Sequence, residues 1–127
     1  MSALVLEREL DRLEGLWAEG LADLYRTYLD IVDGRREPEL RPKLALAAAL
    51  VEVGVRLQGL GGPAAPAAAL LMGDLCLARS SRILTDAASQ PTQIAFARAV
   101  EEMSGAAASN AEAPGVRELL TRALAAH

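Results

Sequence analysis

The chain of 127 residues carries 13 basic and 17 acidic side chains, a net charge of −4, one cysteine and few aromatic residues. It has no basic stripe, so this balance argues against nucleic-acid binding, and the lone cysteine excludes an internal disulfide and favours a reducing compartment. The length predicts a single domain, 1–127, and hydrophobic residues make up 52% of it, which is more than so small a domain is expected to bury and therefore favours a partner interface.

The first predicted element is a long amphipathic helix, for which Ser2 can act as N-cap and which we expect to end near Asp33-Gly34. Its apolar side chains recur at steps of three and four: Leu6, Leu10, Leu13, Trp17, Leu21, Leu24 and Tyr28. Its start lacks the basic region and apolar core of a signal peptide, and no run in the chain approaches the roughly 20 apolar residues that span a bilayer. We therefore expect a cytoplasmic protein that does not cross a membrane.

Residues 35–39 predict a charged, exposed loop, after which Pro42 suits the first turn of a second, alanine-rich helix. Glycines and Pro63 break this helix at residues 59–63. Three further helices are expected, over about residues 66–88, from Pro91 and from Pro114. No useful length of sequence alternates with the period of two typical of strands, so we predict an all-α fold, a bundle of about five helices.

Asp74 lies in the third predicted helix, inside a run from Leu70 to Ala78 that is otherwise apolar. Moving an ionised carboxylate out of water without partners costs many kcal/mol, so we expect Asp74 to be paired, hydrogen-bonded, at a water-filled seam or facing another chain. A hydrogen bond from Asp74 to nearby backbone, or a pair with Arg79, would explain this carboxylate equally well by a structural role alone. Cys76 in the same run is expected to be a small buried hydrophobe. The run predicts a buried or interfacial helix.

The common catalytic and metal-binding patterns are missing from the sequence. His127 is the only histidine, which excludes histidine triads and zinc sites built on histidine. The three glycines within residues 59–62 lack the Lys-Ser or Lys-Thr of a phosphate-binding loop. Glu101 and Glu102 are neighbours on a predicted helix, so they point about 100° apart and favour a solvated face over an acid pair. We predict no catalytic, substrate-binding or metal-binding residue and no cofactor in this chain.

Three segments, taken in order, resemble the trans-isoprenyl diphosphate synthase family, all-α enzymes that elongate allylic diphosphates with isopentenyl diphosphate. Residues 39–46, Glu-Leu-Arg-Pro-Lys-Leu-Ala-Leu, resemble the family's Gly-Gly-Lys-Arg-x-Arg-Pro loop and the helix after it. Residues 68–84 are similar to the Gly-Asp helix that follows the first aspartate-rich motif, and residues 96–112 resemble the next helix. The resemblance extends over about residues 20–112 and implies part of the isoprenyl diphosphate synthase fold.

The sequence departs from this family where the family binds diphosphate and magnesium. Pro38 and Glu39 stand where the family's loop supplies a Lys and an Arg. Residues 58–63 replace the Asp-Asp-x-x-Asp motif, and the chain contains no Asp-Asp pair, although magnesium bridging phosphates requires such oxygen ligands. The chain resembles the small, non-catalytic subunit of heterodimeric hexaprenyl and heptaprenyl diphosphate synthases. This implies a chain that is inactive alone, with magnesium expected on the partner.

The implied partner is a larger catalytic synthase subunit with two Asp-Asp-x-x-Asp motifs. The resemblance implies that this chain completes the tunnel for the prenyl tail and helps set prenyl chain length in isoprenoid biosynthesis, for quinone side chains such as that of menaquinone. A homo-oligomeric helical adaptor and an enzyme acting alone on a hydrophobic ligand remain open as rival functions.

The partner is expected to bind one stripe of the third helix, formed by positions that share a helix face: Leu70, Asp74, Leu77, Ala78 and Ser81. The alternative is that this stripe is the domain's own core and that the partner-facing residues are Leu71, Leu75 and Arg82.

Overall fold

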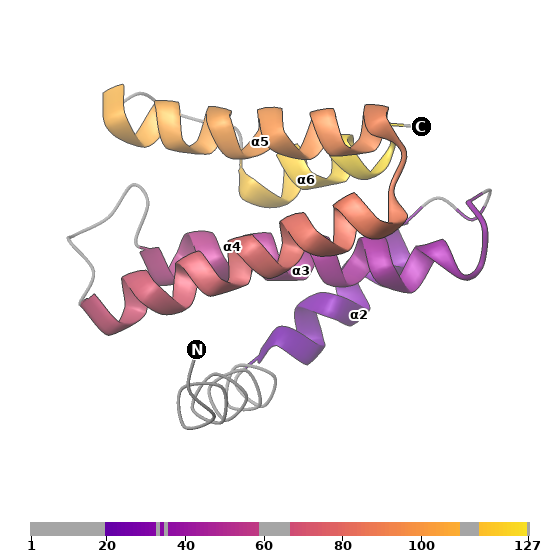
Figure 1. Ribbon diagram of the computed structural model, residues 1–127, viewed down its shortest axis with the longest axis horizontal. Coiled ribbons are helices and arrows are strands. Elements are labelled where there is room, and N and C mark those ends of the chain that lie inside the picture. The colour runs from indigo at the N-terminus through magenta and orange to yellow at the C-terminus, as the bar shows by residue number, and fades with distance from the viewer. Residues whose placement is uncertain (1–19, 33, 35, 59–66, 110–114, 127) are drawn as a thin grey trace.

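The computed structural model describes residues 20–32, 34, 36–58, 67–109 and 115–126. These residues form five helices and no strand, which confirms the all-α prediction (Figure 1). In chain order the helices are α2 (Ala22–Ile31), α3 (Leu40–Gln58), α4 (Ala67–Ala87), α5 (Gln90–Ser109) and α6 (Val116–Leu124).

The helix bounds follow the glycine and proline breaks of the sequence. Pro42 lies in the first turn of α3, where its missing N–H removes no helical hydrogen bond, and α3 ends at Gln58, directly before the glycine-rich break. The first predicted helix is only partly confirmed. Its end is close to the prediction, but α2 begins at Ala22, and Gly20 has a φ of 125°, which no α-helical residue has. The part of the predicted helix before residue 20, with Ser2, Leu6, Leu10, Leu13 and Trp17, lies outside the described residues.

Helix α3 lies at the centre of the fold, beside α4, with α2 on one side and α5 and α6 on the other (Figure 1). Four of its alanines are fully buried: Ala45, Ala47, Ala48 and Ala49. Small side chains let α3 and α4 approach closely at two facing glycines. A Cβ atom placed on Gly73 would lie only 2.8 Å from the carbonyl oxygen of Gly54, so this crossing requires glycine.

Helices α5 and α6 pack against each other and share one hydrophobic core with α2, α3 and α4. Phe96 and Met103 of α5 are buried, and so are Leu119, Leu120 and Leu124 of α6. No helix among the described residues has the length and apolar character needed to cross a membrane.

Arg36 corrects the prediction of an exposed loop at residues 35–39. Residues 37–39 are exposed, but Arg36 is only 6% exposed. Its guanidinium Nη2 donates to the carbonyl oxygens of Leu124, at 2.7 Å, and Ala126, and the hydroxyl of Thr92 also donates to Ala126 O, at 2.7 Å. A cation is favoured at a helix C-terminus, where carbonyl groups lack helical partners. Arg36 therefore anchors the end of α6 to the loop after α2.

Candidate functional site

Helix α4 buries one face against α3 and leaves the others accessible. Ser80 lies on the buried face, where its hydroxyl donates to the carbonyl oxygen of Ala47 in α3 at 2.8 Å. Cys76, also on this face, is 0% exposed, as predicted for a small buried hydrophobe, and burial raises the pKa of its thiol to about 11. Among residues 70–87 of α4, the buried ones are Met72, Gly73, Cys76, Ser80 and Leu84.

The predicted partner stripe lies outside this buried face. Leu70 is 42% exposed, Leu77 is half-buried, and the remaining exposed members of the stripe are Asp74, Ala78 and Ser81. The alternative in which this stripe forms the domain's own core is therefore wrong. Leu71, at 51%, and Arg82 are exposed too, and Leu75 is half-buried, so α4 offers two accessible stripes. Binding of a partner to either stripe stays a prediction.

Asp74 is exposed, and its carboxylate is hydrogen-bonded, which is one of the situations expected for it. Within the run around it, Met72, Gly73 and Cys76 are buried, whereas Leu70, Leu71 and Ala78 are exposed like Asp74. Its Oδ1 accepts a hydrogen bond of 2.5 Å from Nε2 of Gln58, the last residue of α3. The partner within the chain is thus Gln58 and not Arg79. An exposed carboxylate remains hydrated and has no need of a buried counter-charge.

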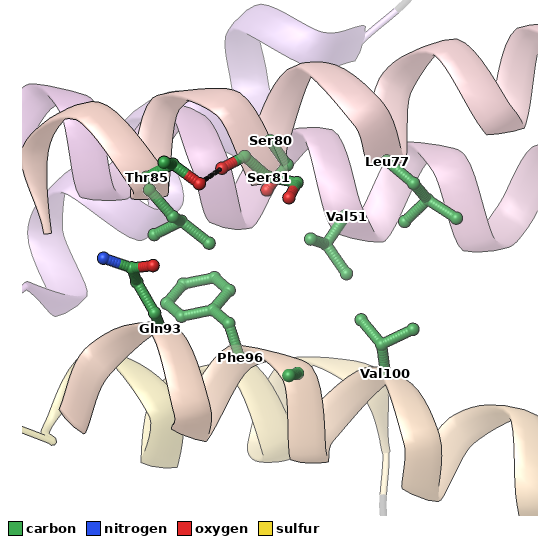
Figure 2. Close-up of a pocket in the computed structure, with 10 residues that line it drawn as sticks. Val51, Leu77, Ser80, Ser81, Thr85, Gln93, Phe96 and Val100 are labelled. Atoms are coloured by element: carbon green, nitrogen blue, oxygen red, sulfur yellow. Dashed lines mark hydrogen bonds between the residues drawn. The ribbon is translucent and has the colours of Figure 1, made fainter. Parts of the chain in front are cut away.

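A cavity of about 450 Å³ opens between α4 and α5, with Val51 of α3 at its floor (Figure 2). Leu77 and Ser81 of the predicted stripe line it, so sequence reasoning found two of its residues without predicting the cavity. Across from them, α5 contributes Gln93, Phe96 and Val100, with Phe96 projecting between the helices (Figure 2). The volume falls in the range of small-molecule sites, and none of the ten described residues that line the cavity is charged.

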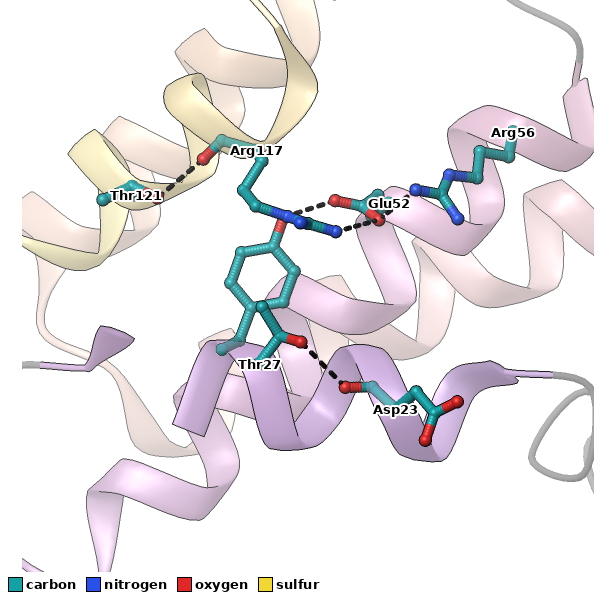
Figure 3. A network of polar contacts seen from close by, with 7 residues as sticks. Asp23, Thr27, Glu52, Arg56, Arg117 and Thr121 are labelled. Atoms are coloured by element: carbon teal, nitrogen blue, oxygen red, sulfur yellow. Dashed lines mark hydrogen bonds and ion pairs between the residues drawn. The ribbon is translucent and has the colours of Figure 1, made fainter. Parts of the chain in front are cut away.

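A second group of polar side chains joins three helices around Glu52, which is 2% exposed (Figure 3). Its Oε1 accepts a hydrogen bond of 2.8 Å from the hydroxyl of Tyr28. Its Oε2 lies 2.7 Å from a guanidinium nitrogen of Arg56 and 3.4 Å from one of Arg117. Burial, followed by the bond to Glu52, raises the pKa of Tyr28, and the same carboxylate raises the pKa of Arg117.

These contacts give Glu52 a structural role, because both oxygens of its carboxylate are bonded to side chains of the fold itself. The sequence carried a signal for it that was missed: Glu52 interrupts an apolar run, Leu50-Val51-Glu52-Val53, as Asp74 interrupts its own. Of the two carboxylates, Glu52 is the buried one.

Among the described residues, no group of three or more His, Cys, Asp or Glu side chains could hold a metal ion, and Glu101 and Glu102 are exposed, as expected for a solvated face. Comparison of the chain with protein-family models, curated proteins and solved structures found no match. The synthase resemblance therefore stays a prediction that depends on the sequence motifs alone.

Proposed function

We propose that this chain is the non-catalytic subunit of a heterodimeric polyprenyl diphosphate synthase, which binds a larger catalytic subunit through α4 and helps set the length of the prenyl product. The observation that supports this proposal is the apolar, accessible surface of α4. Leu70 and Leu71 are 42% and 51% exposed at neighbouring positions, although the opposite face of the same helix is fully packed. Apolar area of this kind is typical of partner interfaces.

The energetics of such a complex need no catalytic group on this chain. Burying apolar surface against the partner would contribute roughly 25 cal/mol per Å². Asp74, exposed at the edge of the same surface, would accept a hydrogen bond from the partner at its rim. Magnesium would bind to the two Asp-Asp-x-x-Asp motifs of the partner.

The proposed effect on product length is steric. Each additional isoprene unit placed against apolar side chains gains several CH₂ equivalents, at about 0.8 kcal/mol each, until a side chain blocks the path. Leucines of α4 that complete the tunnel wall would therefore move the point at which growth stops. The product would serve as a quinone side chain, such as that of menaquinone.

Co-expression with a larger subunit bearing two Asp-Asp-x-x-Asp motifs tests the proposal. The pair should co-purify and make a longer product than the larger subunit alone from farnesyl and isopentenyl diphosphates with magnesium. Leu70→Arg and Asp74→Leu should weaken the complex if the predicted stripe binds the partner, whereas Leu71→Arg should do so if the other stripe does. Ile94→Arg on α5, at a site 45% exposed, is the matched control.

A complex unaffected by all three α4 variants would overturn the assignment of α4 as the interface. Self-association without a synthase would instead support the rival function, a homo-oligomeric helical adaptor. Prenyl transfer by this chain alone would overturn the non-catalytic role.

A further inference from the structure

We propose that the cavity between α4 and α5 binds a small uncharged molecule with a hydrocarbon body and a hydroxyl head, and that the hydroxyl donates to Gln93. The proposal depends on the lining of the cavity and not on the proposed synthase partner. Leu77 and Val100 lie at one end of the cavity and Gln93 and Thr85 at the other, where Phe96 lies beside Gln93 (Figure 2).

The apolar end and the volume determine the size of the ligand body. Phe96, Val51 and Val100 present hydrocarbon surface from two helices to the same space. An engineered cavity of about 150 Å³ holds one benzene molecule, so a cavity of about 450 Å³ accommodates a body of up to roughly 18 non-hydrogen atoms.

The polar end presents hydrogen-bond acceptors. Nε2 of Gln93 donates to the carbonyl oxygen of Ala88 at 3.0 Å, which orients the amide so that its Oε1 is drawn on the side of Phe96 (Figure 2). The hydroxyl of Thr85 donates to the carbonyl oxygen of Ser81 at 2.8 Å, so its own oxygen is left to accept. Two acceptors at one end of an apolar cavity select a ligand that brings a donor.

The charge of the lining selects a neutral donor. The ten lining residues include no Asp, Glu, Lys, Arg or His. A carboxylate or phosphate would lose its hydration and meet only other hydrogen-bond acceptors, which is costly. An ammonium group would lose its hydration without gaining a counter-ion, which is costly as well. A hydroxyl donates to Gln93 Oε1 without either penalty, and it can accept in return from the hydroxyl of Ser81.

The test is a titration of labelled protein at pH 7.4, followed by NMR, with three probes that share one alkyl chain: 1-octanol, octanoate and octylammonium. Octanol should shift the methyl signals of Leu77 and Val100 and the side-chain amide signal of Gln93, and it should bind at least about tenfold more tightly than either ion. Gln93→Glu should reverse the preference in favour of octylammonium, and Gln93→Leu should weaken octanol binding, because the hydroxyl loses its acceptor.

Ala97→Trp should block the cavity, because Ala97 lines it from an exposed position on α5, and Ile94→Trp, exposed on the same helix outside the lining, is its control. Equal affinity for the three probes, or octanol binding that Ala97→Trp leaves unchanged, would overturn the proposal. Self-association of the chain that Ala97→Trp removes would also overturn it, since the cavity would then be an interface between copies.

Discussion

The hydroxyl of Tyr28 in α2 lies 2.8 Å from Oε1 of Glu52 in α3, and the two side chains are 0% and 2% exposed. The other carboxylate oxygen carries the ion pairs to Arg56 and Arg117, whose side chains are 64% and 50% exposed. The cations therefore keep much of their hydration, and the cost of desolvation falls on Glu52. Since Arg117 belongs to α6, this carboxylate links the first and last described helices to the central one.

Tyr28→Phe is expected to lower the free energy of unfolding by about 1–3 kcal/mol, because it leaves Oε1 of Glu52 buried without its donor. Urea denaturation measures this loss. Thr121→Ala is the control: its hydroxyl donates to the carbonyl oxygen of Arg117 on the exposed face of α6, and its removal should cost less than about 0.5 kcal/mol. Equal losses for the two variants would contradict the role of the buried bond.

Gly73→Ala is expected to destabilise the protein, although alanine favours helices. Its Cβ would lie 2.5 Å from Cγ of Gln58 and 2.8 Å from the carbonyl oxygen of Gly54, so α3 and α4 would have to move apart. The strain should cost about 1–3 kcal/mol. Gly105→Ala in α5 meets no atom within 4 Å and should instead stabilise by about 0.5–1 kcal/mol. Thermal unfolding of both variants measures the opposite signs, and a stabilising Gly73→Ala would show that the two helices are not in contact there.

Cys76 should make stability depend on pH in a defined window. Burial raises the pKa of its thiol from 9.0 to about 11. As the pH rises above 9, the unfolded chain therefore loses this proton before the folded protein does, and the thiol's contribution to stability is lost between pH 9 and 11.

Comparison of the wild type with Cys76→Ala isolates this effect. The free energy of unfolding of the wild type should fall relative to that of the variant by up to about 1.4 kcal/mol per pH unit in this window, and the difference should be constant below it. Chemical denaturation at a series of pH values provides the data. A difference that stays constant up to pH 11 would mean that the thiol is open to solvent.

The sequence predicted the elements that local chemistry determines and missed the contacts between distant segments. Pro42, Pro91 and the glycines after Gln58 mark helix ends because they act on their own backbone. Asp74 and Glu52 look alike in sequence, each one carboxylate in an apolar run, and only the packing of α2 and α6 over α3 makes Glu52 the buried one.

The cavity was missed for the same reason. Its lining depends on how far α5 lies from α4, and that separation is determined by the packing of α5 on α6, which no periodicity of a single helix reveals. Leu77 and Ser81 were predicted to face a partner because they share a helix face, and that same face lines the cavity.

Arg36→Met is expected to release the C-terminal end of α6. The guanidinium of Arg36 donates to the carbonyl oxygens of Leu124 and Ala126 and lies 3.5 Å from the hydroxyl of Thr92. The variant leaves the buried carbonyl oxygen of Leu124 without this donor, whereas Ala126 O keeps the hydroxyl of Thr92. The expected loss in the free energy of unfolding is about 1–3 kcal/mol. Hydrogen exchange should also accelerate first in the amides of α6, because the other helices keep their own contacts.

Arg122→Met separates this anchoring from the general effect of removing an arginine near the same helix end. Arg122 pairs with Glu118 at 2.8 Å, one turn away on the same helix, and their side chains are 65% and 57% exposed, so its loss should cost no more than about 0.5 kcal/mol. If Arg36→Met and Arg122→Met changed α6 exchange equally, the effect would come from net charge. If Arg36→Met alone accelerates it, residue 36 holds the last helix in place from a loop 88 positions earlier in the chain than Leu124.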